Sequence, residues 1–211
     1  MPNASKLLCC LRYAPLTVLL VAAAVPGAAN AGPYEVALAA AEQGDYATAL
    51  RLWRSLAEQG DADAQYSLGV MYNNGDGVPR DYAEAMKWHR KAADHGNGNA
   101  QFNLGFMYDR GRGMPQSYAE AAKWYSLAAN QGVAIAQYKL GVMYHDGQGV
   151  PQDYVHAHMW FSLAAAQFPA SETENRDEAV KARDFVASKM TPAEITEAQK
   201  LAREWALRPE R

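Results

Sequence analysis

The hydrophobic and polar positions between residues 61 and 168 repeat every 36 residues. Within each copy, small and apolar residues follow one another at steps of four, as Ala64, Leu68 and Tyr72 do. Spacing of this kind marks one face of an α-helix, so the pattern predicts an all-α protein built from repeats. The segments that align without a gap are residues 64–72, 100–108 and 136–144.

Each repeat unit is predicted to hold two helices, over residues 63–74 and 82–94 in the first unit. Gly75 and Gly77 end the first helix, because glycine accepts the left-handed conformation that a helix C-terminus commonly needs. A polar residue then precedes the second helix, where its side-chain oxygen can accept hydrogen bonds from exposed N–H groups. The predicted N-caps are Asp81, Ser117 and Asp153, with Glu84 and Glu120 completing capping boxes in the first two units.

Weaker or different patterns flank the three full units. Residues 32–60 are predicted to form a degenerate helix pair, and residues 169–211 lack the repeat but carry helix-start signals at Ser171-x-x-Glu174 and Thr191-Pro192-Ala193-Glu194. We expect these C-terminal residues to form helices that cap the exposed end of the array, as repeat stacks require. The full units are predicted over residues 61–96, 97–132 and 133–168.

The repeated pattern A-Q-x-x-L-G-x-x-Y-x-x-G-x-G-V-P-x-D-Y-x-x-A-x-x-W resembles the Sel-like repeat, a relative of the tetratricopeptide repeat. The resemblance covers about residues 34–168. It implies an α-solenoid, a right-handed superhelix of antiparallel helix pairs whose inner surface binds a protein or peptide. Members of this type act as adaptors, so the resemblance implies a protein–protein interaction scaffold rather than an enzyme.

Residues 1–31 are predicted to be a signal peptide. A basic start without acidic residues precedes an apolar stretch over residues 16–25, and Ala29-Asn30-Ala31 places small residues before a cleavage site. The stretch is too short to span a membrane as a helix, which takes about 20 residues. A lipoprotein signal is the weaker alternative, because Cys9 and Cys10 precede the apolar stretch. We expect cleavage after Ala31 and a periplasmic or secreted protein with no stable membrane span.

The composition of the chain narrows the chemistry that it can perform. Lys and Arg total 20 against 23 Asp and Glu, a net charge of −3, so we expect no nucleic-acid partner. Both cysteines lie in the predicted signal peptide, which leaves the mature chain without a disulfide or a thiol nucleophile. No serine has a lysine three positions later, and the G-x-S-x-G motif is absent. We therefore expect no catalytic residue, no cofactor and no metal site.

Two other functions stay open as alternatives. Cysteine-rich members of the resembled family are linked to β-lactam binding and hydrolysis, so a β-lactam-binding or hydrolysing enzyme is the first. A cell-wall glycan or muropeptide binder is the second, because columns of aromatic rings could stack on sugars. The helical spacing of these columns against Ala and Leu favours a core role instead. The columns are Trp88, Trp124 and Trp160, and Tyr72, Tyr108 and Tyr144.

Two further columns predict how the helices pack. One consists of glycines in mid-helix, where glycine costs about 1 kcal/mol relative to alanine. A cost repeated at the same place predicts close helix–helix contact, and we expect that contact beneath the tryptophan rings. The other consists of glutamines, which we expect to be buried links between backbone groups. The columns are Gly69, Gly105 and Gly141, and Gln65, Gln101 and Gln137.

The columns that vary between copies predict where a partner binds. They lie on the side of the first helix opposite the invariant columns, at about 100° of rotation per residue. In tetratricopeptide-like superhelices the first helix lines the concave face, so we expect a groove there, with plain solvent exposure as the alternative. Val70, Phe106 and Val142 favour the groove, because apolar residues amid a polar face suggest an anchor strip. The predicted partner-binding residues are Ser67, Val70, Asn74, Asn103, Phe106, Arg110, Lys139, Val142 and Asp146.

Overall fold

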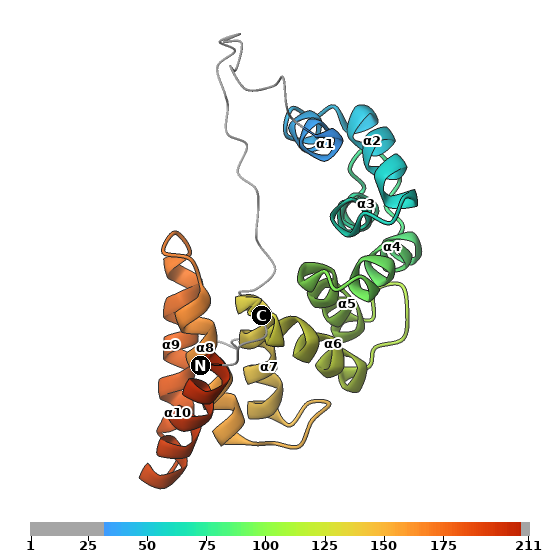
Figure 1. Cartoon of the computed structure of the whole chain (residues 1–211). Helices are drawn as coiled ribbons and strands as arrows, with labels where there is room; N and C mark the ends of the chain where they lie inside the picture. The colour runs from blue at the N-terminus through green and yellow to red at the C-terminus, as the bar shows by residue number, and fades with distance from the viewer. Residues whose placement is uncertain (1–31, 208–211) are drawn as a thin grey trace. The chain divides into compact units, whose positions relative to one another are not determined.

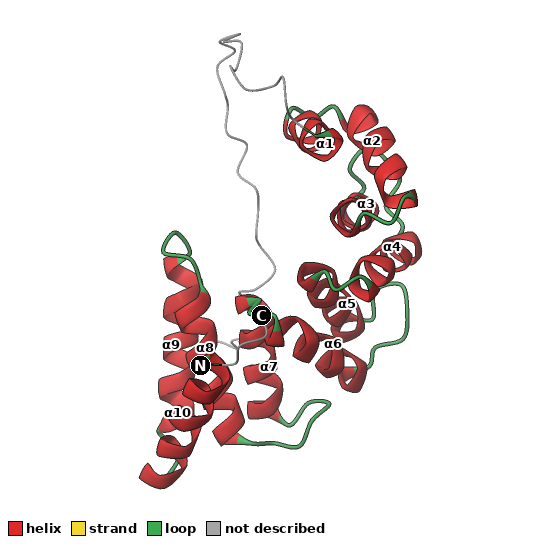
Figure 2. Cartoon of the chain, viewed as in Figure 1, coloured by secondary structure: helices red, strands yellow, loops and turns green. Residues whose placement is uncertain are grey.

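The computed structural model describes residues 32–207, and every regular element within that range is an α-helix (Figures 1 and 2). The predicted signal peptide and residues 208–211 lie outside the described residues. The prediction of an all-α fold is confirmed. The helices are α1 (Pro33–Glu42), α2 (Tyr46–Glu58), α3 (Ala62–Asn74), α4 (Tyr82–Asp94), α5 (Gly98–Arg110), α6 (Tyr118–Asn130), α7 (Ala134–Asp146), α8 (Tyr154–Gln167), α9 (Thr173–Ala187) and α10 (Pro192–Ala206).

The helices pack mainly against their neighbours in the chain, which is the arrangement of a solenoid. Helices α1 to α8 form four consecutive pairs, and each pair packs on the next. Figure 1 shows α1, α3 and α5 on the inner side of this curved array, with α2, α4 and α6 on its outer side. At the C-terminal end α9 and α10 both pack on α8, so the predicted capping helices cover the last pair.

Polar side chains begin the second helix of each repeat, as predicted. Asp81 accepts hydrogen bonds from the backbone of Ala83 and Glu84, and Ser117 and Asp153 cap α6 and α8 in the same way. Left-handed glycines end the first helices, with φ of +85° at Gly75. These signals lie within a few residues of one another in the chain, which is why sequence spacing locates them.

The predicted capping boxes are wrong for the repeats. The side chains of Glu84 and Glu120 turn away from the N-cap and pair with Lys87 and Lys123, one turn later, at 2.6 and 2.5 Å. The charged partner on the helix surface competes with the single backbone N–H of the N-cap residue. A complete capping box is present at the start of α10, between Thr191 and Glu194, as predicted.

The start of α9 also differs from its prediction. This helix begins at Thr173, its N-cap residue is Glu172, and no side chain caps it. Ser171 therefore lies outside the helix, although Ser171-x-x-Glu174 has the spacing of a capping box. The chain makes a turn at Pro169, whose carbonyl oxygen accepts from the backbone N–H of Glu172, and this turn delays the helix start.

Mid-helix glycines allow close contact within each helix pair, as predicted, but a different ring lies over them. A Cβ at Gly105 would lie 2.6 Å from the ring of Tyr125. At Gly69 and Gly141 the corresponding rings are His89 and Phe161, at 2.5 and 2.8 Å. The ring comes from the residue after each tryptophan, so the prediction of a tryptophan over the glycine is wrong. One residue along a helix is a rotation of about 100°, which turns the tryptophan away from the pair.

The tryptophan and tyrosine columns are less buried than predicted. Trp160 is only 6% exposed, but Trp88 and Trp124 are half-buried, as are all three tyrosines of the other column. The half-buried tryptophans carry cations on their rings: Lys91 lies 4.3 Å from the ring centroid of Trp88, and Arg90 lies 4.5 Å from that of Trp124. The Lys91 contact lies within α4, whereas the contact between Arg90 and Trp124 joins two successive repeats.

The residues of the glutamine column are buried, as predicted, and they link successive helix pairs through their amide nitrogens. Gln65, Gln101 and Gln137 are buried, and each Nε2 donates to a backbone carbonyl oxygen at the end of the preceding second helix. The acceptor of Gln65 is the carbonyl oxygen of Ala57, at 3.0 Å. Each of these carbonyl oxygens also accepts from the backbone N–H of the glycine three residues later, so the glutamine amide uses the second acceptor position of the oxygen at each of the three junctions.

Candidate functional site

The residues predicted to bind a partner lie on α3, α5 and α7, the first helices of their pairs. Asn74, Arg110 and Asp146 are the last residues of these helices, and all three are exposed. Val70, Phe106 and Val142 lie one turn earlier and are half-buried. The structure thus places a row of apolar side chains beside a row of exposed polar ones, along the inner helices of the array.

Ser67 does not belong to an exposed surface. Its side chain is buried, with 8% of the residue exposed, and its hydroxyl group donates to the carbonyl oxygen of Asp63 at 2.9 Å. The hydroxyl group of Tyr34, on α1, lies 3.2 Å from the Ser67 oxygen. The prediction that Ser67 lines an open groove is therefore wrong, because the N-terminal helix pair covers this position.

Phe106 is the largest apolar side chain of the row, and two arginines lie over its ring. The guanidinium carbon of Arg112 is 5.0 Å from the ring centroid, and that of Arg110 is 5.7 Å from it. The ring of Phe102 stacks beside it at 6.4 Å. Phe106 also packs against a buried cluster with members on α6, α7, α8 and α10. Its side chain is therefore half-buried and contributes both to the core and to the surface.

Lys139 adds a third cation near this aromatic centre. Its side chain is half-buried on α7, and burial is the main cause that lowers its pKa, with Arg110 acting in the same direction. Asp109 and Glu178 oppose that shift in the pKa, so Lys139 lies within electrostatic range of one arginine and two carboxylates. Asp109 also lies 3.6 Å from the Nε of Arg110. A partly desolvated lysine gains from an additional carboxylate, so this group favours an anionic ligand.

Asn103 faces the repeat junction rather than solvent. Its amide nitrogen lies 3.4 Å from Nε2 of His89, and burial lowers the pKa of this histidine to about 4. The imidazole is therefore neutral at pH 7, and its Nε2 can accept from the Asn103 amide. Val142, in the next repeat, packs partly against Phe161 and Val186. Asn103 and Val142 therefore pack against neighbouring helices and contribute less to the exposed surface.

Arg112 belongs to the site, although the sequence prediction missed it. It lies in the loop after α5, and its guanidinium group is also 5.7 Å from the ring of Tyr82, on α4. The variable columns that predict the groove are all helical positions. The loop column that contains Asp76, Arg112 and Gln148 varies as strongly, so the same criterion applied to loops finds Arg112.

Within residues 32–207, no cluster of three or more His, Cys, Asp or Glu residues could hold a metal ion. None of the helices in the described part of the chain is long and apolar enough to cross a bilayer. What the inner face offers is an aromatic ring, three cations and exposed polar groups. Such a surface can bind an extended segment through apolar contact and charge-assisted hydrogen bonds.

Comparison with known proteins identifies the class. The Sel1 repeat family matches residues 34–61, 62–97, 98–133 and 134–167, which is more than half of the chain. This protein belongs to the Sel1 repeat family, whose fold commonly serves as a protein–protein interaction scaffold. The first matched range coincides with the helix pair that the sequence pattern described as degenerate.

Solved structures share the architecture. The chain is similar to a Sel1 repeat protein from Oxalobacter formigenes, with 28% identity, a TM-score of 0.63, and coverage of 81% of this chain and 74% of that one. It is also similar to c5321, a protective antigen present in uropathogenic Escherichia coli strains, with 28% identity and a TM-score of 0.56. That match covers 82% of this chain but 44% of c5321, so the chain spans less than half of the antigen. Among curated proteins, none matches the sequence.

Proposed function

We propose that this protein is an exported scaffold that binds an acidic peptide segment of a partner protein on the inner face of α5 and α7. The observation that carries the proposal is the Phe106 ring with two guanidinium groups over it, those of Arg112 and Arg110, at 5.0 and 5.7 Å from its centroid. A half-buried ring supplies apolar contact, and Arg110, Arg112 and Lys139 supply positive charge around it. A chain with a net charge of −3 has no general attraction for anions, so this local cluster gives selectivity.

The proposed location outside the cytoplasm rests on the N-terminal sequence. Residues 1–31 have the three parts of a signal peptide, and cleavage after Ala31 would release a chain that begins at Gly32. Fractionation of cells followed by N-terminal sequencing tests this part of the proposal. A mature chain that begins at Gly32 outside the cytoplasm supports export, and a cytoplasmic chain that begins at Met1 overturns it.

Site-specific photo-crosslinking tests the proposed face. A photoreactive side chain at Asn74, Asp146 or Arg112 should capture the same partner, because all three lie along the inner helices or the loop beside them. Matched positions are Lys87 and Lys123 on α4 and α6, whose side chains are each 68% exposed. Adducts from the inner positions alone support the proposal. Adducts from Lys87 and Lys123 alone move the binding surface to the outer helices.

The two alternative functions have direct assays. Turnover or tight binding of a chromogenic β-lactam by the purified chain would favour the enzyme alternative. Retention on purified peptidoglycan, released by soluble muropeptides, would favour the glycan binder. We expect neither, because the inner face presents a cationic aromatic cluster and the sequence lacks the S-x-x-K motif of serine β-lactam enzymes.

A further inference from the structure

An arginine connects successive helix pairs in two of the repeats. Arg54 of α2 donates a hydrogen bond to the hydroxyl group of Tyr72 on α3, at 2.8 Å. The same step of 18 residues joins Arg90 of α4 to Tyr108 of α5, at 3.2 Å. Arg90 also lies over the ring of Trp124, the tryptophan of the next second helix. A guanidinium group beside a tyrosine hydroxyl is thus a recurring feature of this fold, and in the second case a tryptophan face completes its surroundings.

The third copy lacks that arginine. The residue 36 positions after Arg90 is Ser126. The residues that correspond to Tyr108 and Trp124 in this copy are Tyr144 on α7 and Trp160 on α8. The short Ser126 side chain turns back and donates to the carbonyl oxygen of Ala122, at 2.7 Å. Among residues 32–207, no side chain donates a hydrogen bond to the Tyr144 hydroxyl group. The tyrosine and the tryptophan of this copy keep their places without the cation that joins their counterparts.

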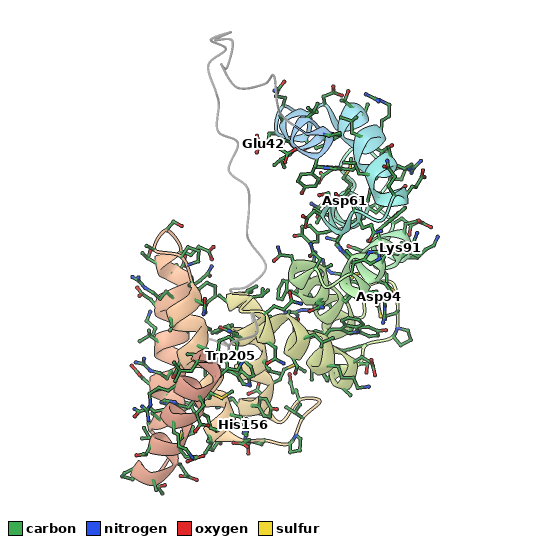
Figure 3. The ribbon with its side chains drawn as sticks, in the orientation of Figure 1. Glu42, Asp61, Lys91, Asp94, His156 and Trp205 are labelled. Atoms are coloured by element: carbon green, nitrogen blue, oxygen red, sulfur yellow. The ribbon has the colours of Figure 1, made fainter. Side chains whose placement is uncertain are left out.

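A pocket of about 310 Å³ occupies the position of the missing side chain. Ser126, Tyr144 and Trp160 all line it, so the pocket is the direct counterpart of the arginine sites. Glu204 and Trp205 of α10, in the C-terminal cap, also line the pocket. Figure 3 labels two of the lining residues, His156 and Trp205. The remaining lining residues are Asn130, Leu140, His156, Met159 and Leu201.

The walls of this pocket suit a planar cation. Trp205 meets Trp160 edge to face, with ring centroids 5.9 Å apart, and the Trp205 indole N–H donates to Asn130 at 3.3 Å. The two rigid indole rings give faces on which a guanidinium group can lie, while the ring of Tyr144 stacks on that of His156, with centroids 5.2 Å apart. Glu204 is exposed at the pocket and offers a carboxylate, which an arginine fork can bind with two parallel hydrogen bonds. The imidazole of His156 is hydrogen-bonded to the carboxylate of Asp153, with Nδ1 and Oδ2 2.7 Å apart.

We propose that this pocket binds the arginine side chain of a partner protein. The guanidinium group would take the place that Arg54 and Arg90 occupy in the earlier copies, against Tyr144 and the indole rings, with Glu204 as its counterion. The pocket lies between α6, α7, α8 and α10, and Phe106 is not among the residues that line it. It is therefore a second binding site, and its test does not depend on whether the inner face binds an acidic segment.

Nuclear magnetic resonance titration tests the proposal with a defined probe. The probe is a blocked pentapeptide with one central arginine between alanines, and its matched control has citrulline in place of arginine. Citrulline keeps the shape but carries no charge. The arginine peptide should shift the indole N–H signals of Trp160 and Trp205 in the full chain, while those of Trp53 and Trp88 stay in place. The citrulline peptide should leave all of them unchanged.

Two variants make the test specific. Ser126→Arg restores the intrachain arginine, should fill the pocket and should abolish the shifts. Its matched control is Leu127→Arg, which adds the same side chain at a neighbouring position that is 48% exposed, and this variant should bind as the parent does. Glu204→Gln should weaken binding about threefold, as expected for loss of one exposed ion pair.

The outcomes separate cleanly. Equal shifts with the citrulline peptide, undiminished binding by Ser126→Arg, or shifts confined to residues on α3 and α5 would each overturn the proposal. If Ser126→Arg does not fold, the comparison of the two peptides and the Glu204→Gln variant still decide. A third peptide with leucine at the centre tests the apolar occupant, and stronger shifts with leucine than with arginine would also contradict the cation site.

Discussion

Gly105 of α5 lies beneath the ring of Tyr125 of α6, and a Cβ on the glycine would come within 2.6 Å of ring atom Cδ1. Tyr125 is buried, with 1% of the residue exposed, so its ring has no free space into which to move. The replacement Gly105→Leu should therefore overpack the pair and destabilise the protein by about 1–3 kcal/mol or more. Chemical denaturation followed by circular dichroism measures the change. An unchanged unfolding midpoint would show that the two helices are not locked at this contact.

His89 predicts a dependence of stability on pH. Burial lowers the pKa of its imidazole to about 4, from 6.5 in the unfolded chain. The unfolded state therefore binds a proton more readily between these two values, and the free energy of unfolding falls as the pH drops from about 6.5 to about 4. The full difference is roughly 3 kcal/mol. Urea denaturation at a series of pH values between 4 and 7.5 measures it.

The repeat itself supplies the control for this titration. The column that contains His89 holds Tyr125 and Phe161 in the following copies, so His89→Phe places a ring that the fold already accepts. This variant should lose the part of the pH dependence that lies between 6.5 and 4 and keep whatever carboxyl groups contribute. Identical pH profiles for the variant and the parent chain would mean that folding does not lower the pKa of His89.

Trp205 should matter more for stability than its place near the C-terminus suggests. It is 3% exposed and packs edge to face on Trp160, so it closes the end of the last repeat. Trp205→Ala should cost about 3–5 kcal/mol, because a buried ring is removed and α10 loses its anchor. Hydrogen exchange should accelerate first in α8 and α10. The matched change Leu207→Ala, at a residue 81% exposed, should have little effect, and equal effects of the two changes would contradict this role.

Sequence spacing predicts the features that depend on residues close together in the chain. The N-caps at Asp81, Ser117 and Asp153 and the capping box at Thr191 and Glu194 need only local geometry, and they are confirmed. The close glycine contacts are confirmed as well, because a mid-helix glycine repeated in every copy indicates tight packing at that place. The identity of the ring above each glycine depends on helix rotation, and a shift of one residue is enough to bring a different side chain there.

Contacts between distant parts of the chain could not be predicted in the same way. Tyr34 covers Ser67 from a helix pair with a weak repeat pattern, so nothing near Ser67 in the sequence signals its burial. The cation over the ring of Trp124 comes from Arg90, on the preceding second helix, and the spacing of the two residues does not signal that contact. By contrast, the change from Arg90 to Ser126 is visible in the aligned copies. The pocket that results could not be predicted, because it depends on a tyrosine and a tryptophan that only the fold brings beside Ser126.

The central claim is that the inner face around Phe106 anchors a partner. The most direct measurement is the affinity of the partner identified by crosslinking for the double variant Phe106→Ala with Arg110→Ala, compared with the parent chain. Loss of a central anchor of about 2 kcal/mol predicts at least thirtyfold weaker binding. The helical circular dichroism should be nearly unchanged, because Phe106 is half-buried and Arg110 is exposed. Lys87→Ala with Lys123→Ala, on the outer helices, serves as the matched control and should bind as the parent does. An affinity that survives the loss of Phe106 and Arg110, or a fold that collapses with it, would contradict this claim.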